Sequence, residues 1–308
     1  MLKNSNQKKS IIINCDTGID DAVALLLALK SGKVDIKLIV TDVGNVSTKQ
    51  AAQNTLNVLE LFGSEDIPVC AGEGKCLVQE RNRIVVHGKT GLGEYVFDEI
   101  DRKPIKGDAV EKMYQTIIEN EQKTTLVCMS PSTNIAKLII KHPEVKEKIE
   151  RLIYMAGSIE ELGENEIPYT EYNVSCDPEA AEVVFNSGIK IDLVPMEMGH
   201  TAYLEWQDVF ETKNENYTGS VLEIIFRSYK DRHVKNGIAT HDGCAIAYLT
   251  NPEIFKTRPV YGEVKYFDKI GTGVLTVNFN QKPNMTTCTE VDVKKFRKLY
   301  FKALRKCK

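Results

Sequence analysis

The stretch that decides the fold spans residues 11–22 and reads IIINCDTGIDDA. Its run of isoleucines predicts a buried strand over 11–15, a turn follows over 16–19, and residues 20–30 have helical spacing. A strand that passes through a short turn into a helix is the first half of a βαβ unit. The chain therefore opens like an α/β protein.

The same alternation continues along most of the chain. Apolar β-branched runs predict strands, and segments with helical spacing predict the helices between them. The predicted strands cover 35–40, 67–69, 124–129, 152–155 and 190–194, and the predicted helices cover 47–62, 108–120, 134–141 and 178–186. This order predicts right-handed crossovers and a mainly parallel central sheet flanked by helices.

The last third of the chain has a different order. Helices are predicted over 220–236, 241–249 and 291–304, and strands over 258–266, 273–278 and 285–289. No linker-like, repeated or low-complexity stretch divides the sequence. We predict one Rossmann-like domain over residues 1–308, with a C-terminal α+β portion.

Composition narrows the class of protein. Hydrophobic residues make up 42% and charged residues 27%, and the formal net charge is -3, so neither nucleic acid nor a membrane surface is an expected partner. The eight cysteines form no C-x-x-C pair, which favours buried free thiols over a zinc or redox site. No signal peptide or membrane span is visible, and we expect a cytoplasmic protein.

Three carboxylates, those of Asp16, Asp20 and Asp21, fall within six residues at the end of the first strand. In open parallel sheets, ligands bind at the carboxyl ends of the strands. Asp20 and Asp21 suit the start of a helix on structural grounds alone, but that explanation leaves Asp16 unaccounted for. Oxygen ligands without nearby His or Cys suggest Ca²⁺ or Mg²⁺. From this cluster, metal binding and a structural role are equally favoured.

Two other families place acids here. The triplet Asp16-Thr17-Gly18 is also the aspartic-protease signature, but that fold is all-β. Haloacid-dehalogenase-like phosphatases use the first Asp of D-x-D as nucleophile, and this chain has Asn14 there. The parallel α/β pattern argues against the first assignment, and Asn14 rules out the usual chemistry of the second.

Further polar segments stand at predicted strand-to-helix junctions. They are Ser130–Asn134, Glu171-Tyr172-Asn173 and Thr240-His241-Asp242-Gly243. Each alone is more typical of a turn or a helix cap. Their joint placement favours a shared site.

Together these segments resemble the inosine-uridine nucleoside hydrolase family. The family motif D-x-D-x-G-x-D-D-A reads N-C-D-T-G-I-D-D-A over 14–22, and V-x-G-N reads Val43-Gly44-Asn45. The G-P-L-T-N-like turn is 130–134, the N-x(5)-E-F-N and D-P-E-A-A motifs are Asn165, 171–173 and 177–181, and the H-D motif with A-x-A-Y-L is 241–242 and 245–249. The matches run in order from residue 11 to about residue 301.

The resemblance implies a calcium site. Asp16, Asp21 and Asp242 would supply carboxylates, and Thr133 would supply its backbone carbonyl. Ribose hydroxyls and a water would complete a shell of the six to eight oxygens that Ca²⁺ takes.

The resemblance also implies hydrolysis of the N-glycosidic bond of ribonucleosides to ribose and free base, an EC 3.2.2 reaction. Asp16 would activate the Ca²⁺-bound water, and His241 would protonate the leaving base. The residues expected to contact the ribose are Asp20, Asn45, Met155, Asn165, Glu171, Tyr172 and Asn173. His87, Tyr229 and His233 could face the base, with Tyr229 and His233 one turn apart on the predicted 220–236 helix. Members of the family are commonly homodimers or homotetramers.

Three departures from the motifs stand out. Asn14 replaces the first Asp, Met155-Ala156-Gly157 replaces M-G-G, and Ser130 and Ser132 alter the G-P-L-T-N turn. The alternatives are a non-catalytic nucleoside- or ribose-binding protein and a hydrolase of another N-riboside, such as nicotinamide riboside. The sequence does not rank purine against pyrimidine bases.

Overall fold

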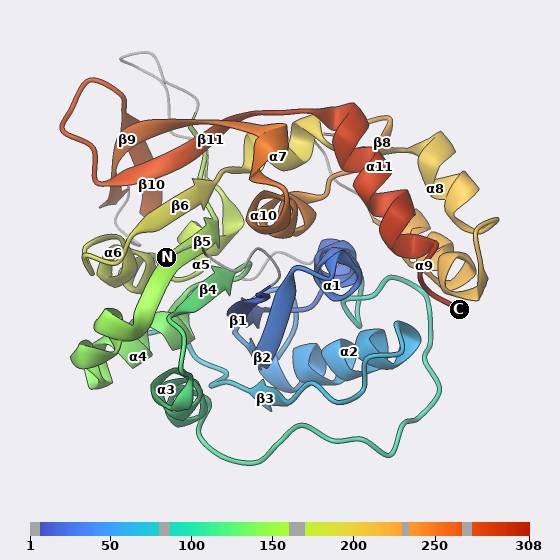
Figure 1. Ribbon diagram of the computed structural model, residues 1–308, viewed down its shortest axis with the longest axis horizontal. Coiled ribbons are helices and arrows are strands. Elements are labelled where there is room, and N and C mark those ends of the chain that lie inside the picture. Colours follow the sequence, from blue (N-terminus) through green and yellow to red (C-terminus); the bar gives the residue numbers. More distant parts are fainter. Residues whose placement is uncertain (1–6, 80–86, 160–169, 230–233, 267–272) are drawn as a thin grey trace.

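A computed structural model describes residues 7–79, 87–159, 170–229, 234–266 and 273–308. Among these residues, nine strands form one sheet in the order β10-β9-β11-β6-β5-β4-β1-β2-β3 (Figure 1). Their bounds are β1 Lys9–Cys15, β2 Val34–Thr41, β3 Val69–Ala71, β4 Thr124–Cys128, β5 Ile149–Met155, β6 Ile191–Val194, β9 Phe255–Tyr266, β10 Gly273–Asn278 and β11 Met285–Val291. A separate antiparallel ribbon pairs β7 (Leu204–Glu205) with β8 (Gly237–Ile238).

The sheet is parallel from β3 across to β11 and antiparallel only through β9 and β10. The α/β class with a mainly parallel sheet and a C-terminal α+β portion is therefore confirmed. Strand β3 lies two residues later than predicted. The carbonyl of Pro68 accepts from the Ile39 amide, so pairing with β2 begins there and runs forward to Ala71.

Helices cover both faces of the sheet (Figure 1). Successive residues of β1 divide between the two layers: Ile11 and Ile13 pack with one core, and Ile12 with the other. One layer contains α1 (Ile19–Ser31), α2 (Thr48–Leu61), α10 (His241–Thr250) and α11 (Val293–Leu304), and the other contains α3 (Ala109–Glu119), α4 (Thr133–Lys141) and α6 (Pro178–Phe185). Burial on both faces explains why the strands read as continuous apolar runs.

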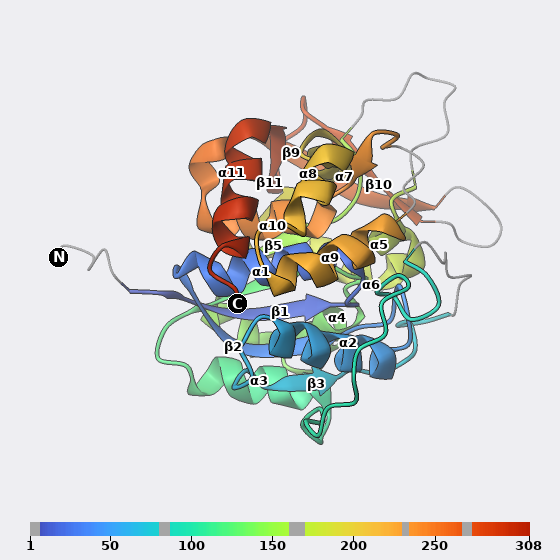
Figure 2. The same cartoon turned by 90° about the vertical axis from the view of Figure 1, so that its right-hand side faces the viewer.

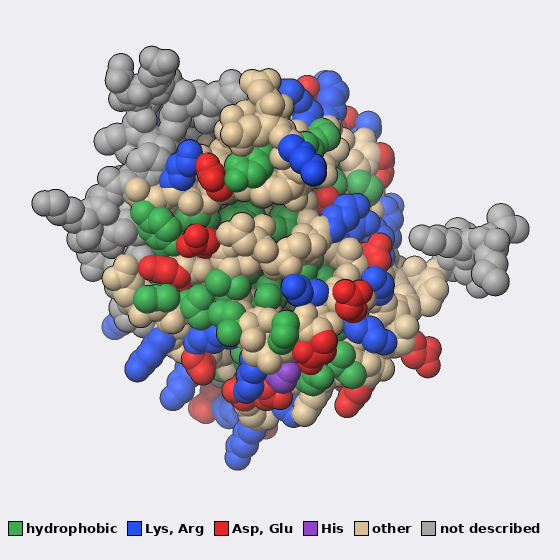
Figure 3. Space-filling view, turned by 90° about the vertical axis from the view of Figure 1, so that its left-hand side faces the viewer, with side chains coloured by type: hydrophobic (Ala, Val, Ile, Leu, Met, Phe, Trp, Pro, Cys, Tyr) green, Lys and Arg blue, Asp and Glu red, His purple; other side chains and the backbone are tan. Residues whose placement is uncertain are grey.

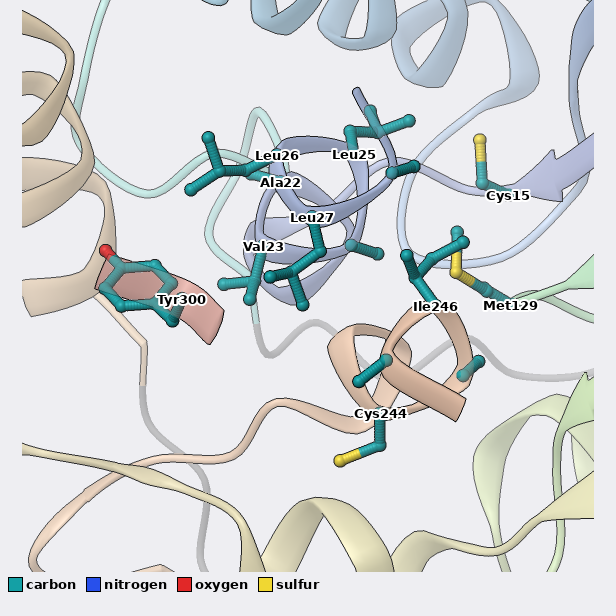
Figure 4. Packing of buried hydrophobic residues seen from close by; sticks show 14 of the residues in the cluster. Cys15, Ala22, Val23, Leu25, Leu26, Leu27, Met129, Cys244, Ile246 and Tyr300 are labelled. Carbon is teal, nitrogen blue, oxygen red and sulfur yellow. The ribbon is translucent and has the colours of Figure 1, made fainter. Parts of the chain in front are cut away.

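Helices α1 and α10 form the centre of the first layer. Val23 of α1 packs on Gly243 of α10, where a Cβ would stand 3.0 Å from Val23 Cγ1. Ile246 of α10 lies beside Met129, beyond the end of β4 (Figure 4). Each of these side chains is at least nine-tenths buried, and full burial of such a side chain contributes about 2 kcal/mol. This packing brings the N-terminal turns of the two helices to the same edge of the sheet.

The structure also contains short elements that the sequence did not predict: the 3-10 helices Pro143–Lys148 and Pro252–Ile254, α5 (Tyr172–Cys176), α7 (Met196–Thr201) and α8 (Trp206–Thr212). Helices α8 and α11, with α9 (Tyr217–Arg227), lie outside α1 and α10 (Figure 2).

The predicted helix over 220–236 is wrong beyond Arg227, where α9 ends. The amide of Tyr229 bonds to the Phe226 carbonyl, which is the tighter i→i−3 pattern that closes a helix. The loop at Gly93 packs on this end, since a Cβ at Gly93 would stand 2.8 Å from the Ile225 carbonyl. Tyr229 therefore lies after the helix, and residues 230–233 are outside the described residues.

Within the described part of the chain, no helix has both the length and the apolar character needed to cross a membrane. The face in Figure 3 intersperses basic, acidic and apolar side chains. No disulfide joins any of the eight cysteines, and all but Cys307 are buried, which confirms the prediction of thiols and not disulfides.

Candidate active site

The first turn of α1 carries two of the predicted acids. The Gly18 amide donates to Asp21 Oδ2 at 2.6 Å, which caps the helix and fixes the Asp21 side chain. Asp20 is 5% exposed and Asp21 is fully buried. Within the described residues, Asp21 Oδ1 is buried and has no hydrogen-bond partner. One oxygen of this carboxylate is thus structural, and the other is available to a ligand.

Asp242 reaches the same place from α10. One carboxylate oxygen each from Asp20, Asp21 and Asp242 lie within 4.8 Å of one another. All three residues are buried, and Asp242 is 3% exposed. The predicted meeting of residues 21 and 242 is therefore found, and the packing of α1 on α10 causes it.

Asp16, at the carboxyl end of β1, is held by the turn after β2. Asn45 donates its amide to Asp16 Oδ2 at 2.5 Å. Gly44 passes so close that a Cβ there would stand 1.8 Å from the same oxygen. The V-x-G-N turn therefore needs its glycine for close approach, and the turn locks the Asp16 carboxylate.

Burial and mutual repulsion disfavour the charged form of the carboxylates at this edge. Burial is the main cause that raises the pKa of Asp16, Asp21 and Asp242 well above the usual range of a carboxyl group. The neighbouring negative charges raise these pKa values further. A divalent cation would remove the repulsion, and the all-oxygen donor set with an orphaned Asp21 oxygen fits Ca²⁺ or Mg²⁺.

Thr133 is the first residue of α4, which follows β4 after a short turn. Its hydroxyl donates to Asp177 Oδ2 at 2.5 Å. Asp177 also accepts from the amides of Leu77 and Ala180, so it ties three segments together. The Thr133 side chain is therefore engaged by Asp177.

The predicted ribose contacts Glu171 and Asn173 flank the start of α5. Glu171 Oε1 accepts from the Asn173 amide, and Oε2 accepts from Gly157 and Val174. Burial raises the pKa of Glu171, while these amides lower it. The Asn173 side chain donates to the Met155 carbonyl at 2.9 Å. Both side chains are thus positioned by backbone groups at the end of β5.

Of the other predicted ribose contacts, Asn45 and Tyr172 lie within the described residues and Asn165 does not. Asn45 lies beside the α1 turn, because a Cβ at Gly18 would stand 2.9 Å from Asn45 Nδ2. Tyr172 packs with Val43, in the turn after β2, and with Cys176.

His241 opens α10 directly before Asp242. Its imidazole packs over Gly199, where a Cβ would stand 2.3 Å from Nδ1, and its ring centroid is 4.9 Å from that of His200. Burial is the main cause that shifts the pKa of Glu171 upward, and the charge of His241 is a smaller cause that lowers it. The candidate acid therefore lies at the start of α10, next to Asp242 of the acidic cluster.

Two of the three residues predicted to face the base meet each other. His87 Nδ1 accepts from the Ile19 amide at 3.0 Å and lies 3.9 Å from Asp20 Oδ1. Because Nδ1 accepts a hydrogen bond, the ring is neutral and carries its proton on Nε2. The His87 and Tyr229 ring centroids are 5.1 Å apart. His233 lies outside the described residues.

Sequence reasoning missed two acids at this edge. Asp42, fully buried after β2, accepts from Asn14, Val43 and Asn134. Glu197, after β6, accepts from Ser158 Oγ and the Ile159 amide. The available signal was an acid directly after an apolar strand, in T-D-V-G-N and V-P-M-E.

Comparison with known proteins identifies the class. The profile of the inosine-uridine preferring nucleoside hydrolases matches residues 11–298. The chain is 37% identical over 295 residues to the pyrimidine-specific ribonucleoside hydrolase RihA of Salmonella paratyphi B, covering 92% of this chain and 94% of the relative. It is 35% identical over 301 residues to the non-specific ribonucleoside hydrolase RihC of Escherichia fergusonii, covering 96% and 98%. A plant nucleoside hydrolase superposes with a TM-score of 0.87 at 28% identity, covering 97% of this chain and 99% of that structure.

The chain belongs to the inosine-uridine preferring nucleoside hydrolase family. It is a glycosidase that hydrolyses ribonucleosides to ribose and free base, as the sequence predicted. This decides between an enzyme and the non-catalytic binding protein considered above.

Proposed function

We propose that this hydrolase holds one Ca²⁺ between Asp16, Asp21, Asp242 and the Thr133 carbonyl. The observation that carries the proposal is the convergence of the buried carboxylates of Asp20 and Asp21 from α1 with that of Asp242 from α10, with one Asp21 oxygen left without a partner among the described residues. Asp16 follows β1 at the same edge of the sheet. Buried charges are stable when they are paired or bind a metal. Calcium, when bound, would orient the ribose hydroxyls and the attacking water and lower the pKa of that water.

Asp16 accepts the proton of the attacking water. The Asn45 amide and Gly44 fix its carboxylate in one orientation, so the base is positioned before substrate arrives. Its raised pKa, caused first by burial, makes it a better proton acceptor than an exposed aspartate.

The ribose lies against the acidic edge of the sheet. Asp20, Asn45, Asn165, Glu171 and Asn173 hold its hydroxyls, beside Met155 and Tyr172. As the glycosidic bond breaks, the ribosyl group gains oxocarbenium character. The negative charge of the cluster stabilises that cation more than it stabilises the neutral ground state.

His241 protonates the leaving base. An imidazole suits this role because its ordinary pKa lies near neutrality. His87 and Tyr229 border the base; the neutral His87 donates from Nε2 toward a base oxygen or nitrogen.

The substrates are ribonucleosides with either class of base. RihA is named for pyrimidine and RihC for non-specific ribonucleoside hydrolysis. A panel of uridine, cytidine, inosine, adenosine and nicotinamide riboside, assayed for released reducing sugar, ranks the bases and tests the remaining alternative substrate.

The experiment that tests Asp16 as the proton acceptor is the substitution Asp16→Asn. The substitution keeps the shape and the acceptor for the Asn45 amide but removes the basic oxygen, so ribose release falls by at least about a thousandfold while the melting temperature stays close to that of the wild type. Asp35→Asn, the same change at an exposed residue paired with Lys37, serves as the control. Near-normal turnover by Asp16→Asn removes the assigned role.

We also propose a cytoplasmic location, one domain over residues 1–308, and assembly into homodimers or homotetramers. Eight cysteines with no disulfide among them are typical of a reducing compartment. Light scattering at the concentration of the activity assay measures the oligomeric state.

A further inference from the structure

Asp42 lies at the centre of a buried polar network behind the candidate metal site. Its Oδ2 accepts from Asn14 Nδ2 at 3.1 Å and from the Asn134 amide at 3.0 Å, and its Oδ1 accepts from the Val43 amide at 2.8 Å. The residue is fully buried. A single carboxylate thus joins β1, the turn after β2 and the start of α4 at the edge where the site is built.

The bond from Asn134 has a consequence for its neighbour. The amide of Asn134 and the carbonyl of Thr133 belong to one peptide unit, which is planar and trans, so the two groups point in opposite directions. An anchor on the N–H therefore also fixes the direction of the C=O. A carboxylate acceptor makes this bond charge-assisted and increases the negative charge on the carbonyl oxygen.

We propose that Asp42 is a positioning residue for the cation, because it orients and polarises the Thr133 carbonyl through the Asn134 amide. This inference rests on the calcium site proposed above. The Thr133 hydroxyl is held separately by Asp177, so both ends of this residue are fixed before the cation binds. Partners of metal ligands typically change metal affinity by 10–100-fold when they are removed.

The same network explains why Asn replaces the first Asp of the family motif. Asn14 Nδ2 donates to Asp42 and to Ser130 Oγ, while its Oδ1 accepts from Asn134 Nδ2. Only an amide can both donate and accept in this way, and an aspartate at 14 would set two carboxylates about 3 Å apart. Asn14 and Asp42 therefore work as a pair, with the carboxylate at residue 42, after β2, and the amide at residue 14, in β1.

The test is Asp42→Asn, measured at about pH 8 by calorimetric titration with calcium chloride. The variant has one acceptor oxygen where the wild type uses two, and its NH₂ group faces other donors. The calcium Kd rises by at least about tenfold. Asp192→Asn, a buried aspartate of β6 paired with Arg151, is the control for lost stability, and its calcium Kd stays within about twofold of the wild type. An Asp42→Asn protein that is folded and binds calcium as the wild type does overturns the inference.

A second measurement does not depend on that variant's folding. The measurement is NMR of the wild type labelled with ¹³C at the Thr carbonyl carbon and with ¹⁵N at the Asn backbone nitrogen. In this sequence, the two labels are joined by a peptide bond only at Thr133–Asn134 and Thr250–Asn251. Calcium shifts the first signal and leaves the second in place; binding heat without a shift of the first signal overturns the inference. Asp42→Ser, which also removes the charge, shows the same weakened binding.

Failure of the inference and failure of the proposed function are distinguishable. If titration of the wild type with calcium gives no heat of binding, both the proposed calcium site and the role of Asp42 are wrong. If the wild type binds calcium normally and Asp42 variants do so equally well, only the role of Asp42 is lost.

Discussion

The backbone of Gly44 packs tightly against the Asp16 carboxylate. The substitution Gly44→Ala tests whether this contact positions Asp16 for catalysis. The added Cβ would stand 1.8 Å from Asp16 Oδ2 and 2.6 Å from its Cγ. The backbone at Gly44 is not in the left-handed region, so alanine causes no strain there beyond this contact. The substitution therefore acts on the Asp16 carboxylate.

The size of the effect follows from the geometry. To reach ordinary van der Waals contact, the carboxylate has to move by roughly 1.5 Å. A misplacement of about 1 Å in a catalytic group can cost about a hundredfold in rate. We expect kcat/KM for uridine or inosine to fall at least about a hundredfold, which corresponds to about 3 kcal/mol of transition-state stabilisation.

The assay is release of reducing sugar in excess calcium, with the melting temperature as a check of folding. Gly74→Ala is the matched control, because its Cβ would meet its nearest neighbour, Thr48 Oγ1, at 3.7 Å. We expect that control to keep wild-type activity. A folded Gly44→Ala enzyme with kcat/KM within about threefold of the wild type would refute the placement of Asp16 by this turn.

Two further predictions concern charge and protonation. Asp16, Asp21 and Asp242 have raised pKa values in the folded protein. Without a cation, their contribution to the free energy of unfolding is therefore complete below about pH 4, where they are protonated in both states. That contribution is lost as the pH rises through the folded-state pKa values. The rise in melting temperature caused by saturating calcium is therefore larger at about pH 8 than at about pH 5, and an equal rise at both would contradict this. His241→Ala lowers the release of ribose from inosine or uridine by about 10²–10⁴-fold but spares p-nitrophenyl riboside, whose leaving group needs no proton; equal losses on both substrates would count against the acid role.

Much of the fold could be predicted because its signals are local. The bounds of β10 and of most helices before residue 190 agree with the predictions to within a residue or two. The exceptions depend on contacts with distant parts of the chain. Helix α9 ends at Arg227 where the Gly93 loop packs on it, and β3 begins where it can pair with β2.

The candidate site divides in the same way. Asp16, Asp20 and Asp21 were visible as a cluster because they lie within one strand-to-helix turn. Asp42 was not recognised, because its role depends on Asn14 and Asn134, its partners on two other segments.

By itself, the sequence determined the order of strands and helices, the acidic turn after β1 and the family motifs, since each is a pattern of neighbouring residues. Only the tertiary structure decided that Asp242 meets Asp20 and Asp21, that Gly44 presses on Asp16, and that Asp42 holds the Thr133–Asn134 peptide. The physical reason is that parallel strands gather their carboxyl ends at one edge, and the packing of helices on the sheet sets which side chains meet there.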